Sequence, residues 1–108
     1  MPTVTDSGTA TADGTVQTLT DTVDNKYFTF KIDTSAMLTG DADVMTIKIY
    51  DMVLNGGALG IIMQETYTGT QAIPIKFLPP QWVTEEIKVT LQQTAGVNKD
   101  YPWALIEA

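Results

Sequence analysis

The stretch Tyr27-Phe28-Thr29-Phe30-Lys31-Ile32-Asp33 decides the fold class, because its apolar and polar side chains alternate with a period of two. Phe28, Phe30 and Ile32 would point to one side of a strand, and the residues between them would point to the other. This is the pattern of a strand with one buried face. The same alternation recurs in Met45-Thr46-Ile47-Lys48-Ile49, Ile87-Lys88-Val89-Thr90-Leu91 and Tyr101-Pro102-Trp103-Ala104-Leu105.

Turn-forming residues separate these stretches. Asn55-Gly56-Gly57 predicts a hairpin, because these residues tolerate positive φ angles. The returning strand, about residues 58–67, begins with enough apolar residues to be covered on both faces at first. Pro74 lacks a backbone donor and confines its strand to a sheet edge or a bulge. Pro79 and Pro80 predict an extended segment that carries the chain from one sheet to the other.

The chain of 108 residues is expected to form one all-β domain. Seven short strands at intervals of roughly ten residues, with no amphipathic helix of useful length, predict a single antiparallel β-sandwich of about seven to eight strands. Jelly-roll and immunoglobulin-like connectivities both fit. Residues 15–108 would form the sandwich, and residues 1–14 a Thr-rich N-terminal arm that is extended and held by pairing or by a neighbouring subunit.

The composition favours a binding or assembly role over catalysis. His, Cys and Arg are absent, and these residues supply most general bases, soft nucleophiles and phosphate clamps. We therefore expect no enzyme activity, no catalytic residues and no cofactor. The net charge of −7 makes nucleic acid and anionic membrane surfaces poor partners. The longest uncharged apolar stretch, residues 52–63, is too short to cross a bilayer and contains the Asn55-Gly56-Gly57 turn.

Two small-molecule alternatives stand beside this expectation. Asp33, Asp41 and Asp43 lie near one connection, but such residues are more often turn formers than calcium ligands, so no metal site is predicted. Aromatic residues can stack on sugar rings, which keeps glycan binding as an alternative. Of the candidates for such a platform, Trp103 is expected in the core, and Trp82 is the better candidate for an exposed contact.

The N-terminal arm is the segment best suited to bind a partner. It is rich in Thr, a strand former, and free of long charged side chains, so ordering it by strand addition costs little entropy. The residues expected to contact partners are Thr3, Val4, Thr5, Thr9 and Thr11 in the arm, together with Tyr67 and Trp82.

Several segments carry a resemblance to a known class of proteins. They are Phe28-Thr29-Phe30-Lys31-Ile32-Asp33, Leu38-Thr39-Gly40-Asp41, Thr46-Ile47-Lys48-Ile49-Tyr50, Val89-Thr90-Leu91-Gln92-Gln93-Thr94-Ala95-Gly96 and Tyr101-Pro102-Trp103. With them, most of the chain after the arm resembles small β-sandwich proteins encoded in virus genomes, chiefly those of tailed phages. None of the matching motifs is catalytic.

The resemblance implies a virion structural protein on the capsid surface. Similar proteins decorate or cement the outer shell, often as trimers, so the implied partners are the major capsid protein and further copies of this chain in a homotrimer. The alternative hypothesis is a carbohydrate-binding or host-recognition module of a phage tail or fibre. A small secreted or cell-surface adhesion domain is a third alternative.

Overall fold

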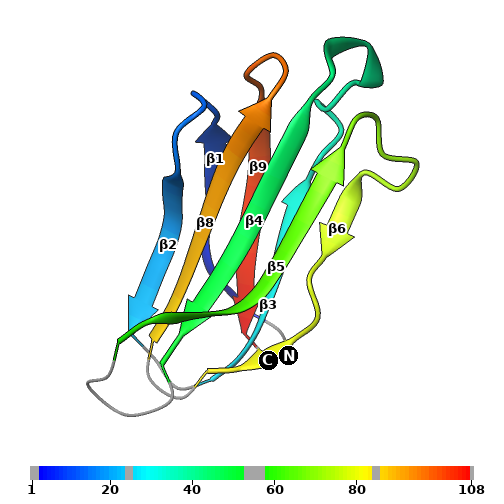
Figure 1. Cartoon of the computed structure of the whole chain (residues 1–108). Helices are drawn as coiled ribbons and strands as arrows, with labels where there is room; N and C mark the ends of the chain where they lie inside the picture. Colours follow the sequence, from blue (N-terminus) through cyan, green and yellow to red (C-terminus); the bar gives the residue numbers. More distant parts are fainter. Residues whose placement is uncertain (1–2, 24–25, 53–57, 84–85, 108) are drawn as a thin grey trace.

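The computed structural model describes residues 3–23, 26–52, 58–83 and 86–107 and contains strands joined by turns, with one short 3-10 helix. The strands form two layers that face each other (Figure 1). Their bounds are β1 Thr3–Thr11, β2 Gln17–Val23, β3 Tyr27–Asp33, β4 Val44–Asp51, β5 Gly60–Thr68, β6 Ile75–Phe77, β7 Gln81–Trp82, β8 Glu86–Ala95 and β9 Asp100–Glu107; the helix η1 is Thr39–Asp41.

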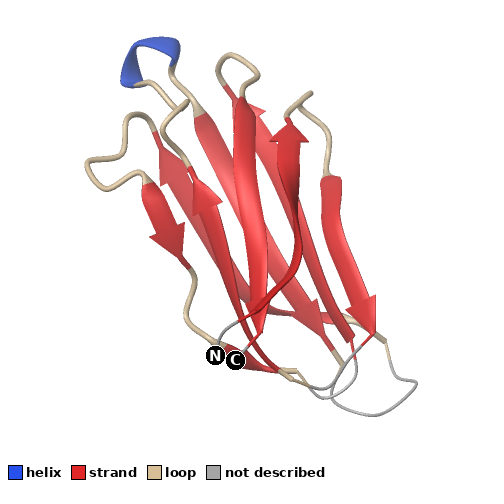
Figure 2. Cartoon of the chain, turned by 180° about the vertical axis from the view of Figure 1, so that it is seen from behind, coloured by secondary structure: helices blue, strands red, loops and turns tan. Residues whose placement is uncertain are grey.

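Each layer is an antiparallel sheet. The five-stranded sheet has the order β1-β9-β3-β6, and β7 pairs with the same strand β3 as β6 does. The four-stranded sheet has the order β2-β8-β4-β5. Figure 2 shows the five-stranded sheet from the other side, where β1 and β9 run next to each other.

The pairing is nested around the β4–β5 hairpin. β4 pairs with β5, β3 with β6 and β7, β2 with β8, and β1 with β9. Successive pairs fall alternately in the two sheets. The further pairing of β3 with β9 joins the pairs of the five-stranded sheet, and that of β4 with β8 joins the pairs of the four-stranded sheet. The chain thus behaves as one long two-stranded ribbon that is rolled up into a sandwich.

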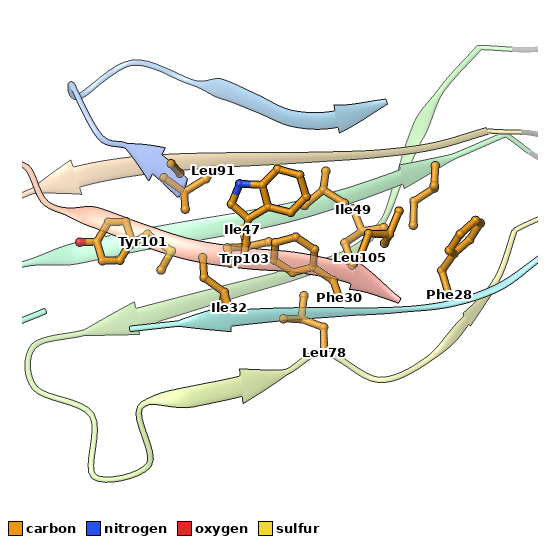
Figure 3. Close-up of a cluster of buried hydrophobic side chains, with 14 of the residues drawn as sticks. Phe28, Phe30, Ile32, Ile47, Ile49, Leu78, Leu91, Tyr101, Trp103 and Leu105 are labelled. Carbon is orange, nitrogen blue, oxygen red and sulfur yellow. The ribbon is translucent and has the colours of Figure 1, made fainter. Parts of the chain in front are cut away.

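The core fills the space between the sheets. In β3 and β4 every second residue is buried, so Phe28, Phe30 and Ile32 face Met45, Ile47 and Ile49 across the two layers. β8 and β9 add Leu91, Tyr101, Trp103 and Leu105 to the same layer of side chains (Figure 3). The rings of Phe30 and Trp103 stack with centroids 6.0 Å apart. The alternation in the sequence is therefore the pattern of one shared core.

The expectation of an all-β antiparallel sandwich is confirmed, but the described residues form nine strands where seven to eight were expected. The difference has two sources. The Thr-rich segment expected as an extended arm is extended, and its residues Thr3–Thr11 form β1 at the edge of the five-stranded sheet. The Pro-rich segment carries the separate short strand β7.

The expected crossing at Pro79 and Pro80 is wrong. Leu78 donates its backbone N–H to Phe30 O at 2.9 Å, and Val83 donates to Lys26 O at 2.9 Å. These bonds keep the segment alongside β3 in one sheet. The prediction of an edge position after Pro74 is confirmed, because β6 lies at the end of its sheet.

One further expectation fails at a sheet margin. Ile61 and Ile62 in the first half of β5 were expected to be covered on both faces, but they are 51% and 43% exposed because β5 is an edge strand. In the β3–β4 connection, Met37 is buried in the core and the adjacent Leu38 is exposed. The predicted hairpin turn Asn55-Gly56-Gly57 lies outside the described residues.

Ile47 and Ile61 lie on the paired strands β4 and β5 and offer a matched test of this core. Ile47 is fully buried and Ile61 is half exposed. We predict that Ile47→Ala lowers the free energy of unfolding by about 2–5 kcal/mol through a cavity, and that Ile61→Ala lowers it by less than about 1 kcal/mol. Urea denaturation followed by circular dichroism measures both; equal losses would contradict the assigned orientation of β4.

Candidate binding surfaces

The first candidate surface is the outer edge of β1. Thr3, Val4, Thr5, Thr9 and Thr11, which the sequence analysis selected, all lie on this strand. β1 pairs with β9 on one side only, from Thr3 opposite Glu107 to Thr11 opposite Asp100, with a register shift between Val4 and Asp6. Within the described part of the chain, no strand pairs with the other side of β1.

Small inward residues allow β1 to lie close over the core. Ala10 is buried opposite Tyr101, and Gly8 lies opposite Trp103. A Cβ atom at Gly8 would make an ordinary van der Waals contact with the Trp103 indole at 3.4 Å, so the backbone of β1 lies close to this ring. β1 is consequently an integral edge strand. On its outer side Thr11 O accepts a hydrogen bond from Gln17 Nε2, and the part of the edge before Thr11 is open to strand addition.

The second candidate surface surrounds Trp82. The Trp82 side chain is 76% exposed, and its ring packs on that of Tyr27 with centroids 4.6 Å apart. Beside them lies a groove with a volume of about 510 Å³. Its lining residues are Tyr27, Thr29, Phe77, Leu78, Pro79, Pro80, Ile106 and Glu107. Most of these side chains are apolar or aromatic, so the groove favours an apolar occupant.

This groove continues into an apolar outer face of the five-stranded sheet. Thr29 lies opposite Ile106, Lys31 opposite Phe77, and Asp33 opposite Ile75, so these side chains share the face turned away from the core. Phe77 is 63% and Ile75 is 42% exposed. A second hollow of about 320 Å³ lies along the same face beside Ile75, Pro102 and Ala104.

The outer face of the four-stranded sheet is polar by contrast. Its hollow of about 160 Å³ is lined by Val16, Thr46, Lys48, Tyr50, Gln64, Thr90, Gln92 and Thr94. The hydroxyl oxygens of Thr46 and Thr66 lie 3.0 Å apart on this face, and Lys88 Nζ lies 5.7 Å from the Tyr50 ring centroid. Among the described residues, the hollow of the four-stranded sheet is thus lined mainly by polar side chains, whereas the groove of the five-stranded sheet is lined mainly by apolar ones.

The other predicted site residues do not gather with Trp82. Tyr67 lies in β5 of the opposite sheet, opposite Met45, and its ring packs against the core with Lys76 Nζ 5.4 Å from its centroid. Tyr101 and Trp103 are buried, which confirms the core position expected for Trp103. The aromatic pair beside the groove is thus Trp82 with Tyr27.

The sequence analysis did not select Tyr27, Phe77 and Ile106 as residues of a binding site. Tyr27 had been placed on the polar side of its strand, which was the available signal for an exposed aromatic. Phe77 lies in an apolar run without alternation, and Ile106 alternates with Trp103 and Leu105, which are expected in the core. In both cases the cross-strand register, which periodicity does not contain, decides which neighbours share a face.

A buried polar cluster closes one end of the sandwich. Asp43 is fully buried, and its Oδ1 accepts hydrogen bonds from Val97 N at 2.8 Å and Gln93 Nε2 at 3.2 Å. Its Oδ2 accepts from Leu38 N at 3.0 Å and Lys99 Nζ at 3.0 Å. All four acceptor positions of the carboxylate are occupied, so Asp43 ties the β3–β4 connection to the β8–β9 loop.

The neighbours of Asp43 complete this cluster. Lys99 Nζ also donates to Asp41 Oδ2 at 2.7 Å and to Ala36 O at 3.1 Å. The Tyr101 hydroxyl donates to Gln93 Oε1 at 2.8 Å. Each polar group thus has a protein partner, and the arrangement is that of a structural anchor.

Electrostatics agree with this role. Burial alone would raise the pKa of Asp43, but hydrogen bonds from Leu38, Lys99 and Val97, together with the positive charge of Lys99, lower it below its usual 3.8. Burial and the negative charge of Asp43 raise the pKa of Tyr101 to about 12. The hydrogen bond to Asp41 is the largest cause that raises the pKa of Lys99. Near neutral pH the cluster holds an ionised Asp43 against a protonated Lys99.

Among residues 3–23, 26–52, 58–83 and 86–107, no group of three or more acidic residues is arranged to hold a metal ion. Asp33, considered as a third ligand, instead accepts a hydrogen bond from Ser35 N at 2.9 Å in a turn. The described part of the chain also has no helix with the length and hydropathy of a membrane span.

Comparisons with protein-family models, with curated proteins and with solved structures find no match to this chain. Functional assignment therefore rests on the surfaces described above.

Gly96 and Gly14 provide a matched test of the Asp43 anchor. Both have positive φ angles, +93° and +86°, but a Cβ atom at Gly96 would lie 2.8 Å from the Asp43 backbone N, whereas no atom lies within 4 Å of one at Gly14. We predict that Gly14→Ala costs about 1 kcal/mol of unfolding free energy and that Gly96→Ala costs about 2 kcal/mol more. Thermal denaturation of both variants measures this; equal costs would show that Asp43 is not packed against Gly96.

The pKa of Asp43 predicts a pH dependence of stability. Because the folded-state pKa is lowered, the stabilisation is present above the unfolded-state value of 3.8 and is lost as pH falls below it. We predict that Asp43→Asn is less stable than the wild type by about 2 kcal/mol at neutral pH, and that this difference shrinks toward zero below pH 3.8. Urea titrations between about pH 2 and pH 7 measure it. A difference that stays constant across this range would contradict the ionised anchor.

Proposed function

We propose that this chain is a non-enzymatic virion structural protein, a decoration or cement protein on the outer capsid surface of a tailed phage. The observation that carries the proposal is the outer edge of β1, a strand of nine residues at the margin of a rigid sandwich. Its partners in this proposal are the major capsid protein and further copies of the chain, as a homotrimer.

The order of the strands supports this proposal by analogy. With β6 and β7 taken as one interrupted strand, the two sheets have the order of an eight-stranded jelly roll, which we propose in preference to an immunoglobulin-like connectivity. Viral capsid proteins and lectins both use jelly rolls. Because a fold hosts many functions, the proposal needs the surface argument as well.

The β1 edge has few of the features that prevent strand addition. Exposed edges are usually protected by charged side chains, proline, short length or bulges. β1 contains one charged residue, Asp6, and no proline, and its single register shift lies near its start. At the opposite margin of the same sheet, β6 has three residues and follows Pro74. Of these two margins, β1 is the one suited to accept or add a strand from a capsid protein.

A second candidate function is carbohydrate or host recognition. It is favoured by one observation, the exposed Trp82 ring held on Tyr27 beside a groove, because such faces stack on sugar rings. The polar groups among the groove's lining side chains are the Tyr27 hydroxyl, Thr29 and Glu107, and Glu107 forms an ion pair with Lys26 at 2.9 Å. Sugar hydroxyls need more partners than this, so we favour the structural role.

Point changes on β1 test the proposal, since a deletion would also remove the buried residues Ala10 and Ala12. We predict that Thr9→Lys leaves the melting temperature nearly unchanged and lowers binding to particles that lack the protein by tenfold or more, because a charge on the edge opposes strand pairing. The matched control is Thr66→Lys, on the edge strand β5 of the other sheet. Particles of the encoding phage supply the assay, with bound protein quantified by mass spectrometry.

Absence of the protein from purified particles, or equal binding of Thr9→Lys and the wild type, would contradict the proposed function. Loss of binding in Thr66→Lys alone would place the contact on the other sheet.

A further inference from the structure

A protruding aromatic side chain and an apolar groove lie side by side on the five-stranded sheet. Trp82 projects from β7 with 76% of its surface exposed, and Tyr27, on which it rests, also lines the groove. A surface that carries both a projection and a hollow can bind a second copy of itself. We propose that this apolar face is the contact between copies of this chain, with Trp82 of one copy seated in the groove of the next.

The extent of the apolar surface favours a protein over a sugar as the occupant. Beyond the groove, the exposed side chains of Phe77 and Ile75 continue the apolar surface along β6. A short saccharide would leave these uncovered, and soluble monomers seldom expose apolar patches of several hundred Å² without a partner. Aromatic side chains are also enriched in the centres of protein interfaces.

The charge distribution allows two acidic copies to meet here. The chain carries a net charge of −7, which opposes self-association in general. On the outward side of β3 and β6, however, the charged residues are Lys31 and Asp33, whose charges cancel. Lys31 lies over the Phe77 ring, with Nζ 5.6 Å from its centroid. Glu107, the charged residue in the groove lining, is paired with Lys26 at 2.9 Å. The part of the face around Phe77 and the groove is therefore nearly neutral, as the core of an interface requires.

The area of this face determines the affinity expected between two copies of the chain. The strands β1, β9, β3, β6 and β7 have nine, eight, seven, three and two residues. At a rise of roughly 3.3 Å per residue and a spacing of roughly 4.8 Å they present a face of roughly 450 Å². Two copies would bury about 900 Å² or somewhat more, which is at the lower end for specific interfaces. We therefore expect association in the micromolar range, strengthened wherever copies are held close together.

This inference rests on the proposed function, since it names the self-contact of the proposed homo-oligomer. Sedimentation equilibrium of the full chain, from about 1 μM to about 1 mM, tests it. We expect a reversible dimer or trimer; a two-fold pair exchanges both Trp82 side chains, and a ring of three passes each to the next copy. Trp82 emission should shift to shorter wavelength on association, while Trp103 is already buried.

Two substitutions locate the contact. Phe77→Asp, on the apolar face, should weaken association at least tenfold, and Trp82→Ala should do the same. The matched control is Ile61→Asp, whose side chain is 51% exposed on the other sheet against 63% for Phe77, and it should associate as the wild type does. Because these residues are exposed, melting temperatures should stay close to that of the wild type.

A monomer throughout the concentration range would overturn the inference, and so would association that Phe77→Asp leaves unchanged. A monomer whose Trp82 emission responds to soluble oligosaccharides would overturn it in favour of sugar binding. The proposed function fails separately: Phe77→Asp monomers that still bind particles would leave that function standing, and an associating wild type that binds no particle would contradict it alone.

Discussion

Every feature of this molecule depends on the burial of one row of alternate side chains between two twisted sheets. Because successive strand residues point to opposite faces, placing Phe28, Phe30 and Ile32 inside forces the residues between them outside. A slip of one residue in the β3–β9 register would exchange the two sets. The core thus fixes the composition of the outer faces, and the apolar outer face of the five-stranded sheet is a consequence of which residues occupy the alternate positions.

The outer faces of the two sheets offer different binding surfaces. The outer hollow of the four-stranded sheet is lined mainly by hydroxyl, amide and lysine side chains. The five-stranded sheet presents the Tyr27–Trp82 pair, the groove and Phe77 on its face, and the open side of β1 at its margin. An edge and a face at right angles can be occupied at the same time. In the proposed function, the edge would hold a capsid protein and the face a further copy of the chain. The Asp43 cluster keeps the loops at one end of this sandwich in place.

Much of the fold could be predicted from the sequence, because period-two alternation is a local signal that each strand carries by itself. The buried rows of β3, β4, β8 and β9 all follow from it. Edge positions could not be predicted in this way: Ile61 is as apolar as Ile47, and only the order of the strands exposes it. The same holds for the Asp43 cluster, since its partners Gln93, Val97 and Lys99 lie some fifty residues away in sequence. Trp82 was selected because two prolines precede it, but its neighbour Tyr27 comes from the β3–β7 pairing.

The central claim is that the protein acts by docking through the five-stranded sheet. Hydroxyl-radical footprinting of the native particle and of the dilute free protein tests this claim most directly, because it reports the exposure of individual side chains. The account predicts that Trp82 and Phe77 are strongly protected in the particle, while Ile61 on the other sheet reacts equally in both states. Equal reactivity of Trp82 and Phe77 in the particle and in free solution would contradict it.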